Sequence, residues 1–287
     1  MMGYVEKLIE LALAEDIGTG DITTDYLIDP VQTGRAVIRA KESLVLAGVG
    51  VAQQVFEMLD PTVRIAALHS DGTALESGTS ILEIEGKLRC LLTGERTALN
   101  FMQRLSGIAT HVRSYVNTMK SLPIRLVDTR KTTPGLRTLE KYAVRMGGAA
   151  NHRMGLFDGV LIKDNHIAAC GGILQAVARM RKHVSHLMKI EVEASNLEEV
   201  QDALEAGADV IMLDNMNGDQ IRDAATLIDG NALIEVSGRV SQDTIVRLAQ
   251  SGVNIISVGA LTHGAKSVDI SMDIVMTFPE TTLPAVE

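Results

Sequence analysis

The second half of the chain alternates short apolar runs with longer amphipathic stretches, and this alternation constrains the fold more than any other feature. The apolar runs have the length of buried strands, and the stretches between them have the apolar spacing of helices. The last four runs recur about every 22 residues, which is typical of compact strand–helix repeats with short loops. The runs lie at 124–127, 160–162, 188–192, 210–213, 232–236 and 254–258, and the helical stretches at 136–146, 172–182, 196–206, 218–228 and 241–250.

This alternation predicts a parallel β-sheet covered by helices, either a barrel or an open doubly wound sheet. In an open sheet that binds a dinucleotide, the first strand is followed by the glycine pattern GxGxxG. The corresponding segment here reads DTRKTTPG and lacks that pattern. We therefore expect a (β/α) barrel, of which six or seven strands can be counted.

The region before this repeat has short apolar segments separated by glycine-containing turns. Such a pattern predicts a small β-rich unit, which we interpret as an α/β sandwich. The predicted domains are a sandwich at 1–110, joined by the C-terminal tail 268–287, and a barrel at 111–267. Strands are expected at 35–40, 42–47, 63–68 and 81–84, and helices at 2–14, 49–59 and from Thr93 to about Met119.

In barrels of this kind the functional residues gather at the carboxyl ends of the strands, which form one rim. Every predicted strand here ends in polar residues or glycine, so the fold would bring cations, carboxylates and glycines together at one mouth. In chain order these ends are Asp128-Thr129-Arg130-Lys131, Lys163-Asp164-Asn165-His166, Glu191-Val192-Glu193, Asp214-Asn215, Glu235-Val236-Ser237-Gly238 and Val258-Gly259-Ala260.

The first two barrel strands and the stretch between them are basic, although the chain as a whole is acidic. From Arg125 to His166, eight Lys or Arg and four Asp or Glu give a formal charge of +4, whereas the whole chain carries −9. Lys141 and Arg145 are spaced i, i+4, which is typical of a solvated helix face. Arg130, Lys131 and Lys163 directly follow apolar runs, and this position indicates an anionic small-molecule ligand.

The cations of this region suit different parts of such a ligand. Lys131 and Lys163 are point charges suited to pyrophosphate, and the planar forks of Arg130 and Arg153 match carboxylates. His152 precedes Arg153 just beyond a Gly-Gly helix end. It either donates a hydrogen bond to a carboxylate or ring nitrogen, or has a structural role.

Two carboxylates and two glycine-containing loops complete the predicted site. Glu193 and Asp214 are oxygen ligands suited to Mg²⁺, directly or through water, together with substrate phosphates; the alternative is helix capping and turn formation. After the last two strands, backbone N–H groups can hold a phosphate. In one of these loops an arginine would either add positive charge or point to solvent. The loop residues are Ser237, Gly238, Arg239, Gly259 and Ala260.

Composition and charge argue against several classes of protein. Only 3% of the residues are aromatic, Trp is absent and the net charge is −9, so nucleic-acid binding is not expected. Cys90 and Cys170 lack metal-site or CxxC spacing, which is typical of reduced thiols in the cytoplasm. We find neither a signal-peptide core nor an apolar run near the roughly 18 residues of a membrane span. We therefore expect a cytoplasmic protein.

Three long segments, DTRKTTPGLR, GGAANHR and LIKDNHI, resemble the signatures of the quinolinate phosphoribosyltransferases, also called carboxylating nicotinate-nucleotide pyrophosphorylases. The similarity runs from LALAEDIGTGDIT near the start to ISVGALTH and DIS near the end. Several long motifs in the same order are far more specific than one short pattern. The chain departs from the family at Ala149 or Ala150, where a third glycine is usual, and at Arg239, where the family has the second glycine of Ser-Gly-Gly.

This resemblance implies an incomplete parallel (β/α) barrel preceded by a small α/β sandwich domain. It implies a pentosyltransferase that moves the phosphoribosyl group of phosphoribosyl pyrophosphate to the ring nitrogen of quinolinate in NAD biosynthesis. Pyrophosphate and CO2 are released and nicotinate mononucleotide is formed. Lys131 and Lys163, with Mg²⁺, would stabilise the departing pyrophosphate. Glu193 and Asp214 would hold metal or ribose hydroxyls, and the glycine-containing loops would hold the 5′-phosphate.

The resemblance also implies a homodimer with shared active sites, and possible further assembly is left open. Arg96 matches an arginine that reaches into the neighbouring subunit's site, where it would hold the carboxylates of quinolinate with Arg130, His152 and Arg153. We expect Arg96 in the first turn of its helix, where a cation is unfavourable for the helix dipole. That position indicates either an external anionic partner or a salt bridge.

Two alternatives remain open at this point. One is a phosphoribosyltransferase of the same architecture with another acceptor, as in the molybdate-associated homologues, which differ around the NHR and KDNH segments. The other is a non-catalytic sensor of anions or nucleotides, which would be expected to have lost a residue at the rim. Arg239 is the place where the phosphate site could be altered.

Overall fold

The computed structural model describes residues 2–119, 122–238 and 240–275, and its internal contacts divide the chain into two compact units. The first unit combines the described residues up to 110 with 266–275, and the second runs from 111 to 265. Residues 276–287 of the tail that the sequence assigns to the first domain lie outside the described residues.

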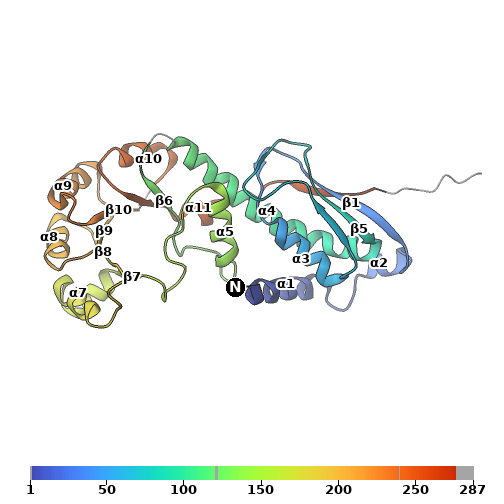
Figure 1. The fold of residues 1–287 in the computed structure, drawn as a ribbon, viewed down its shortest axis with the longest axis horizontal. Helices are drawn as coiled ribbons and strands as arrows, with labels where there is room; N and C mark the ends of the chain where they lie inside the picture. Colours follow the sequence, from blue (N-terminus) through green and yellow to red (C-terminus); the bar gives the residue numbers. More distant parts are fainter. Residues whose placement is uncertain (1, 120–121, 239, 276–287) are drawn as a thin grey trace, which may run out of the picture. The chain divides into compact units, whose positions relative to one another are not determined.

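The first unit is built on an antiparallel sheet with the strand order β12-β1-β5-β3. Its central strand β1 (Thr33–Ala40) pairs on one side with β5 (Ser80–Lys87) and on the other with β12 (Ile270–Val275), the last described strand. The strands and helices expected in this region are confirmed, and α2, β4 and β12 are additional. The other elements are α1 (Met2–Ile17), α2 (Ile22–Leu27), β2 (Leu44–Val45), α3 (Val49–Leu59), β3 (Arg64–Ala67), β4 (Ala74–Leu75) and the first part of α4 (Leu88–Thr118). Figure 1 labels the helices α1 to α4 and the strands β1 and β5.

One expectation for α4 is wrong. The helix begins at Leu88, directly after β5, and not at Thr93. Leu88 and Leu91 are buried at helical spacing, so apolar packing extends the helix backwards without a capping residue. Arg96 therefore lies in the third turn, where the unfavourable interaction with the helix dipole does not apply.

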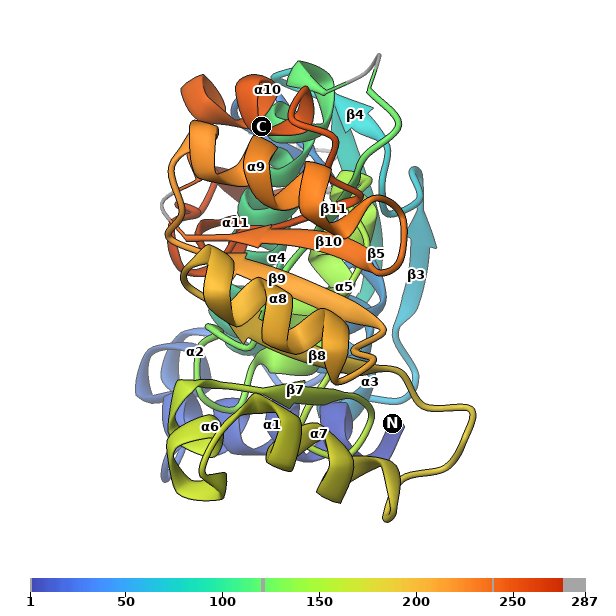
Figure 2. The ribbon, with the colours of Figure 1, turned by 90° about the vertical axis from the view of Figure 1, so that its left-hand side faces the viewer.

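The second unit is a curled sheet of six parallel strands in the order β6-β11-β10-β9-β8-β7. The first strand pairs with the last, so the sheet curls until β6 and β11 are neighbours. Figure 2 shows β7 to β10 stacked in sequence order, with α8 and α9 in front of them. The elements are β6 (Arg125–Val127), α5 (Arg137–Gly147), β7 (Val160–Ile162), α6 (Asp164–Cys170), α7 (Ile173–Arg181), β8 (Ile190–Ala194), α8 (Leu197–Glu205), β9 (Val210–Asp214), α9 (Gly218–Ile228), β10 (Leu233–Ser237), α10 (Gln242–Ala249), β11 (Ile255–Ser257) and α11 (Ala260–His263).

The barrel is not closed by strands between β6 and β7. Residues 148–159, here called the seam segment, run along this opening without forming a strand. A single parallel bridge joins Ala150 to Val127 of β6, with a hydrogen bond of 2.9 Å from Ala150 N to the carbonyl of Leu126. This is the incomplete parallel barrel that the sequence predicted. The segment after β7, expected as a polar strand end, continues into the unpredicted helix α6.

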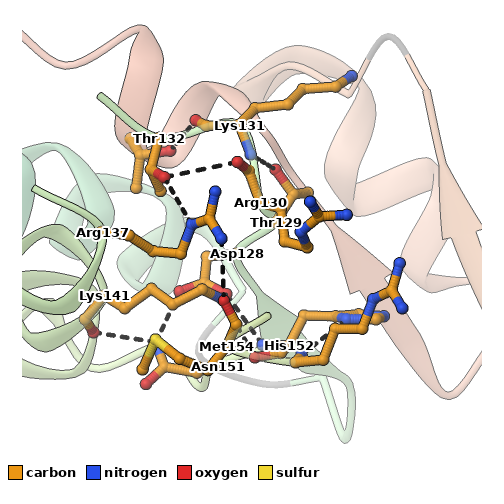
Figure 3. A network of polar contacts seen from close by, with 12 residues as sticks. Asp128, Thr129, Arg130, Lys131, Thr132, Arg137, Lys141, Asn151, His152 and Met154 are labelled. Atoms are coloured by element: carbon orange, nitrogen blue, oxygen red, sulfur yellow. Dashed lines mark hydrogen bonds and ion pairs between the residues drawn. The ribbon is translucent and has the colours of Figure 1, made fainter. Parts of the chain in front are cut away.

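A buried ion pair anchors the seam segment, and it involves a residue that the sequence pattern assigned wrongly. Lys141 of α5 was expected on a solvated face, but its side chain and that of Asp128 are both 0% exposed and form an ion pair. Asp128 also accepts hydrogen bonds from Asn151 Nδ2 (2.6 Å) and from the backbone N–H of His152 (2.9 Å). Lys141 Nζ donates to the carbonyl of His152 (3.1 Å), and Figure 3 shows this network.

The error has a simple physical origin. Helix α5 turns one face toward the end of β6, and Lys141 lies on that face, whereas Arg145, one turn later, is exposed as expected and contacts Asn151. Burial raises the pKa of Asp128 and lowers the pKa of Lys141, and the bond between them opposes both shifts. Each charge is therefore stable in the interior only because the other is present.

We expect Asp128→Asn to lower the free energy of unfolding by about 3–5 kcal/mol, because it leaves the buried ammonium of Lys141 without its counter-charge. Urea denaturation followed by circular dichroism measures this change. The matched control is Arg222→Ala, which removes an exposed ion pair with Asp219 and should change the free energy by about 0.5 kcal/mol or less. Equal effects of the two substitutions would contradict the assignment of the buried pair.

Candidate active site

A cavity of about 640 Å³ opens at the carboxyl ends of the barrel strands. Volumes of this size are typical of sites for small molecules. Most of the site residues proposed from the sequence for the barrel meet here, although they come from separate strands and from the seam segment. The predicted residues that line it are Arg130, Lys131, His152, Arg153, Lys163, Glu193, Asp214, Ser237 and Gly238.

Four of these lining residues are permanent cations. Arg130 and Lys131 follow β6, Lys163 follows β7, and Arg153 belongs to the seam segment. Arg130 Nε is buried and has no hydrogen-bond partner among the described residues. A buried guanidinium N–H without a partner is costly, so it indicates an acceptor atom supplied by a ligand.

Two carboxylates lie in the same cavity at the ends of adjacent strands. Glu193 Oε2 accepts a hydrogen bond of 2.8 Å from Lys163 Nζ, and Asp214 Oδ2 accepts one of 2.8 Å from Asn215 Nδ2. Each carboxylate has a second oxygen beyond these contacts. Hard oxygen ligands placed next to cations of this kind can hold Mg²⁺ together with a phosphate-bearing substrate.

The loops after β9 and β10 pack closely on each other at the rim. Gly238 has a φ of +127°, and a Cβ there would lie 2.8 Å from Asn215 Oδ1. A glycine is therefore required at this position, and its peptide groups line the cavity. On the other side of the mouth, a Cβ at Gly259 would lie 2.9 Å from Cδ of Lys131, so the glycine leaves space for that side chain.

Both ring nitrogens of His152 already have partners within the protein. Nδ1 accepts a hydrogen bond of 2.8 Å from the backbone N–H of Arg153, and Nε2 lies 3.1 Å from Glu191 Oε2. Glu235 Oε1 lies 3.6 Å from Nε2. The hydrogen bond to a substrate carboxylate that the sequence predicts for His152 would require one of these contacts to be broken.

Burial and neighbouring charges shift the pKa values of His152 and Glu235. Burial opposes protonation of His152, but the hydrogen bond with Glu191 and the charges of both glutamates outweigh it and raise the pKa of His152. Burial and the negative charge of Glu191 raise the pKa of Glu235 to about 7. The protonation of His152 and that of Glu235 are therefore coupled through their mutual charge.

The sequence pattern predicts that Glu191 and Glu235 lie at strand ends, and it predicts no role for either. A signal was present, because each is a lone carboxylate within an otherwise apolar strand, in IEVE and LIEVS. Strand alternation places each on the same side as the rim residue two positions later, Glu193 or Ser237. The two glutamates thus form a layer one step deeper in the barrel.

The remaining predicted residues lie elsewhere. Gly259 and Ala260 are at the start of α11 and do not line the cavity. Arg96 lies within α4 in the first unit. Arg239 lies outside the residues that the structure describes.

Comparison with known proteins gives one family for both units. The family model of the quinolinate phosphoribosyl transferase N-terminal domain matches residues 21–106, and that of the C-terminal domain matches residues 108–273. The chain is 46% identical over 273 residues to the probable nicotinate-nucleotide pyrophosphorylase [carboxylating] of Bacillus subtilis, covering 95% of this chain and 94% of that protein.

Solved structures agree over both units. The nicotinate-nucleotide pyrophosphorylase from Francisella tularensis has a TM-score of 0.91 at 42% identity, covering 95% of this chain and 96% of that one. NadC from Streptococcus pyogenes has a TM-score of 0.92 at 43% identity, covering 96% of this chain and 98% of that one. The incomplete barrel and its accompanying sheet are thus a known architecture.

The cavity predicts affinity for a multiply charged anion. We expect inorganic pyrophosphate, titrated calorimetrically in the presence of MgCl2, to bind about tenfold or more weakly to Lys131→Ala than to the unsubstituted protein, since one charge-assisted contact is lost. Lys182→Ala, which removes an exposed lysine outside the cavity, is the matched control and should leave the affinity unchanged. Equal affinity of the two variants would place the pyrophosphate elsewhere.

Proposed function

The chain belongs to the quinolinate phosphoribosyltransferase family, and from this premise we propose that the cavity at its barrel mouth is the site of the family's reaction. That reaction joins the phosphoribosyl group of phosphoribosyl pyrophosphate to the ring nitrogen of quinolinate. It releases pyrophosphate and CO2 and yields nicotinate mononucleotide, a step of NAD biosynthesis.

One observation carries the residue assignment: four cations and two carboxylates from four strand ends and the seam segment line a single cavity of about 640 Å³. Both substrates are strongly anionic, and one of them requires a divalent cation to neutralise its phosphates. A rim that presents only cations would suit an anion sensor. Carboxylates set among the cations fit a site that also holds a metal–phosphate group.

Quinolinate is held by the two guanidinium groups. Arg130 has a buried Nε without a partner among the described residues, and Arg153 is half-buried at the edge of the cavity. Planar guanidinium groups match carboxylates in a two-point geometry, so two of them suit the two adjacent carboxylates of quinolinate. They would also position the ring nitrogen toward the ribose carbon that it attacks.

The pyrophosphate leaving group is held by Lys131 and Lys163. Lys163 Nζ is already fixed by Glu193 at 2.8 Å, which limits the reorganisation needed when negative charge develops on the leaving oxygen. The second oxygens of Glu193 and Asp214 fit Mg²⁺, which when bound supplies further positive charge for the departing pyrophosphate. The same carboxylates stabilise the positive charge that forms at the ribose carbon.

The 5′-phosphate is held by backbone N–H groups at the end of β10, around Ser237 and Gly238. Such N–H groups bind phosphate without needing a cation. After transfer, the ring nitrogen is quaternary and attracts electrons. The C2 carboxylate then leaves as CO2, its bonding electrons remain on C2, and C2 takes up a proton. No covalent link between protein and substrate is needed.

The activity is tested by incubating purified protein with Mg²⁺, phosphoribosyl pyrophosphate and quinolinate and following nicotinate mononucleotide by mass spectrometry. We expect product from quinolinate, none from nicotinate as parallel acceptor, and loss of product when EDTA replaces Mg²⁺. Arg130→Ala should reduce kcat/KM for quinolinate about 100-fold or more, because a charged contact to a buried carboxylate is removed.

The outcomes separate the proposal from its alternatives. Product from another acceptor, with none from quinolinate, would assign the chain to a different transferase of the same architecture. No product from any acceptor, with pyrophosphate still bound by a folded protein, would indicate a sensor. The matched control Arg222→Ala alters an exposed arginine and should retain full activity.

The active form is a homodimer in which Arg96 of each subunit completes the site of the other. Support comes from the first unit, whose surface carries exposed large apolar side chains close together in the sequence. Their exposed fractions range from 73% to 86%, which is typical of surfaces that contact another protein. These side chains are Ile22, Tyr26, Leu27 and Val31.

Mixing two inactive variants tests this sharing of sites. Arg96→Ala and Lys131→Ala should each be nearly inactive, whereas a mixture exchanged to equilibrium should recover ~25% of wild-type activity, because half of the dimers then contain one intact site. Copurification of differently tagged subunits confirms that exchange has occurred. Exchange without recovery would show that Arg96 serves its own subunit or is not needed.

The cytoplasm is the compartment that fits this function. Cys90 and Cys170 are both free thiols, which suits a reducing environment. Within residues 2–119, 122–238 and 240–275, none of the helices has the length and hydropathy needed to span a bilayer.

A further inference from the structure

Three titratable side chains meet inside the barrel, one layer deeper than the rim. They are His152 of the seam segment, Glu191 of β8 and Glu235 of β10, and their nitrogen and oxygen atoms lie within 4.8 Å of one another. Glu191 is 7% exposed and Glu235 is 2% exposed. This is the one such group among the described residues, and the function proposed above gives the glutamates no role.

The hydrogen bonds define which nitrogen of His152 carries the proton. A neutral imidazole has one donor and one acceptor nitrogen. Nδ1 faces the backbone N–H of Arg153 at 2.8 Å, so it must be the acceptor. Nε2 faces two carboxyl groups, at 3.1 Å and 3.6 Å, so it must be the donor. The balance of burial and the two glutamates raises the pKa of His152, but the N–H of Arg153 can donate only to an unprotonated Nδ1. The hydrogen bonds thus select the neutral ring with its proton on Nε2.

The same ring determines where Arg153 lies. The main chain of Arg153 is held through its N–H on Nδ1 of His152, and its side chain is held through Nη1 on the carbonyl of Gly159 at 3.0 Å. Two fixed points along one residue leave its guanidinium little freedom. The remaining N–H groups of Arg153 are available at the edge of the mouth cavity, which this residue lines.

Arg153 also lines a second cavity. It has a volume of about 700 Å³ and lies at the amino ends of the strands. His152, Arg153 and Glu235 line both this cavity and the mouth cavity. The layer that separates the two is therefore thin, and Arg153 borders both cavities.

We propose that Glu191 and Glu235 are positioning residues for the acceptor substrate: they hold His152 with its proton on Nε2, and His152 in turn fixes Arg153 at the edge of the mouth cavity. This inference rests on the proposed function, in which Arg153 binds a carboxylate of quinolinate.

Burying two carboxyl groups carries a large free-energy cost, and the positioning role explains why these two are nevertheless buried. The Oε1 atoms of both are buried and have no hydrogen-bond partner among the described residues. Burial and the charge of Glu191 raise the pKa of Glu235 to about 7. The negative charge of Glu191 also favours the charged guanidinium of Arg153.

A metal ion is the competing occupant, because one histidine and two carboxylates are common ligands. The hydrogen bond at Nδ1 disfavours it. If Nε2 bound a metal, the proton of the neutral ring would move to Nδ1 and would face the N–H of Arg153. Histidine ligands usually donate their other N–H to an acceptor, and here that position is occupied by a donor.

The tautomer can be measured without substrate. Long-range ¹H–¹⁵N correlation spectra of histidine-labelled protein distinguish the Nε2–H ring, the Nδ1–H ring and the imidazolium, and His152→Asn identifies the signal. We expect the Nε2–H ring in the unsubstituted protein at neutral pH. An Nδ1–H ring or an imidazolium would overturn the proposal. Stoichiometric metal in the purified protein that is lost in Glu191→Gln would also overturn it.

Steady-state kinetics test the consequence for binding. Glu191→Leu and Glu235→Leu should each raise KM for quinolinate about tenfold or more and leave KM for phosphoribosyl pyrophosphate within about threefold. Glu191→Gln keeps an oxygen that accepts the Nε2 proton, so it should remain within about threefold for both substrates. Glu198→Leu and Glu198→Gln, at an exposed position on α8, are the matched controls.

The pattern of effects separates positioning from simple loss of structure. Equal rises in KM for both substrates, or failure of Gln to restore what Leu removes at position 191, would refute a specific positioning role. If the unsubstituted protein does not turn over quinolinate, the proposed function fails. The spectrum of His152 still decides the tautomer in that case, so the two failures remain distinguishable.

Discussion

The ion pair between Asp128 and Lys141 is the interaction on which the barrel unit depends. Neither side chain reaches solvent, so each needs the other to remain charged. The carboxylate of Asp128 also accepts from Asn151 and from the N–H of His152, which leaves it well satisfied. These contacts tie three separate pieces together: the end of β6, the helix α5 and the seam segment. Where a complete barrel would close this opening with a paired strand, the chain uses this buried charge pair and the single bridge from Ala150 to Val127.

The residues assigned to quinolinate binding lie at the opening between β6 and β7. The seam segment carries Arg153, and the strand end that it joins carries Arg130. A site supported by several hydrogen bonds to buried groups is held more precisely than one on a free loop. The strand ends on the other side of the barrel, at β8, β9 and β10, carry the carboxylates and glycines assigned to ribose and phosphate. Within one cavity, quinolinate is therefore held mainly by the seam segment and the end of β6, and the ribose and phosphate groups by the ends of β8, β9 and β10.

The sequence was sufficient for the barrel because apolar periodicity reports burial, and burial determines strands and helices. It was sufficient for most of the rim because parallel strands end at one edge, so polar residues after each run meet. It failed where tertiary packing overrides local pattern. Lys141 looks solvated in a spacing of i, i+4, and only the packing of α5 against β6 makes it internal. The pattern predicts a polar strand end at Lys163 to His166 and not helix α6, because these residues directly follow a strand.

The interior group around His152 shows another limit of sequence reasoning. Glu191 and Glu235 are conspicuous as charges within apolar strands, but their meeting depends on the curl of the sheet, which periodicity does not encode. The nearness of Ala150 to β6, which brings His152 over them, depends on the seam. The sequence pattern predicts the start of α4 at Thr93 and not at Leu88, because the helix continues directly from a strand without a capping residue.

The pairing of β1 with β12 has a consequence for biosynthesis. Residues 35–40 pair with residues 270–275, so the sheet that begins first on the ribosome is completed last. The whole barrel must be synthesised before β12 emerges. Until then, one side of β1 presents unpaired backbone groups in the nascent chain, and such an edge can pair with another chain. The sheet of the first unit therefore closes only when synthesis of the chain is nearly complete, whereas the barrel is made from contiguous sequence.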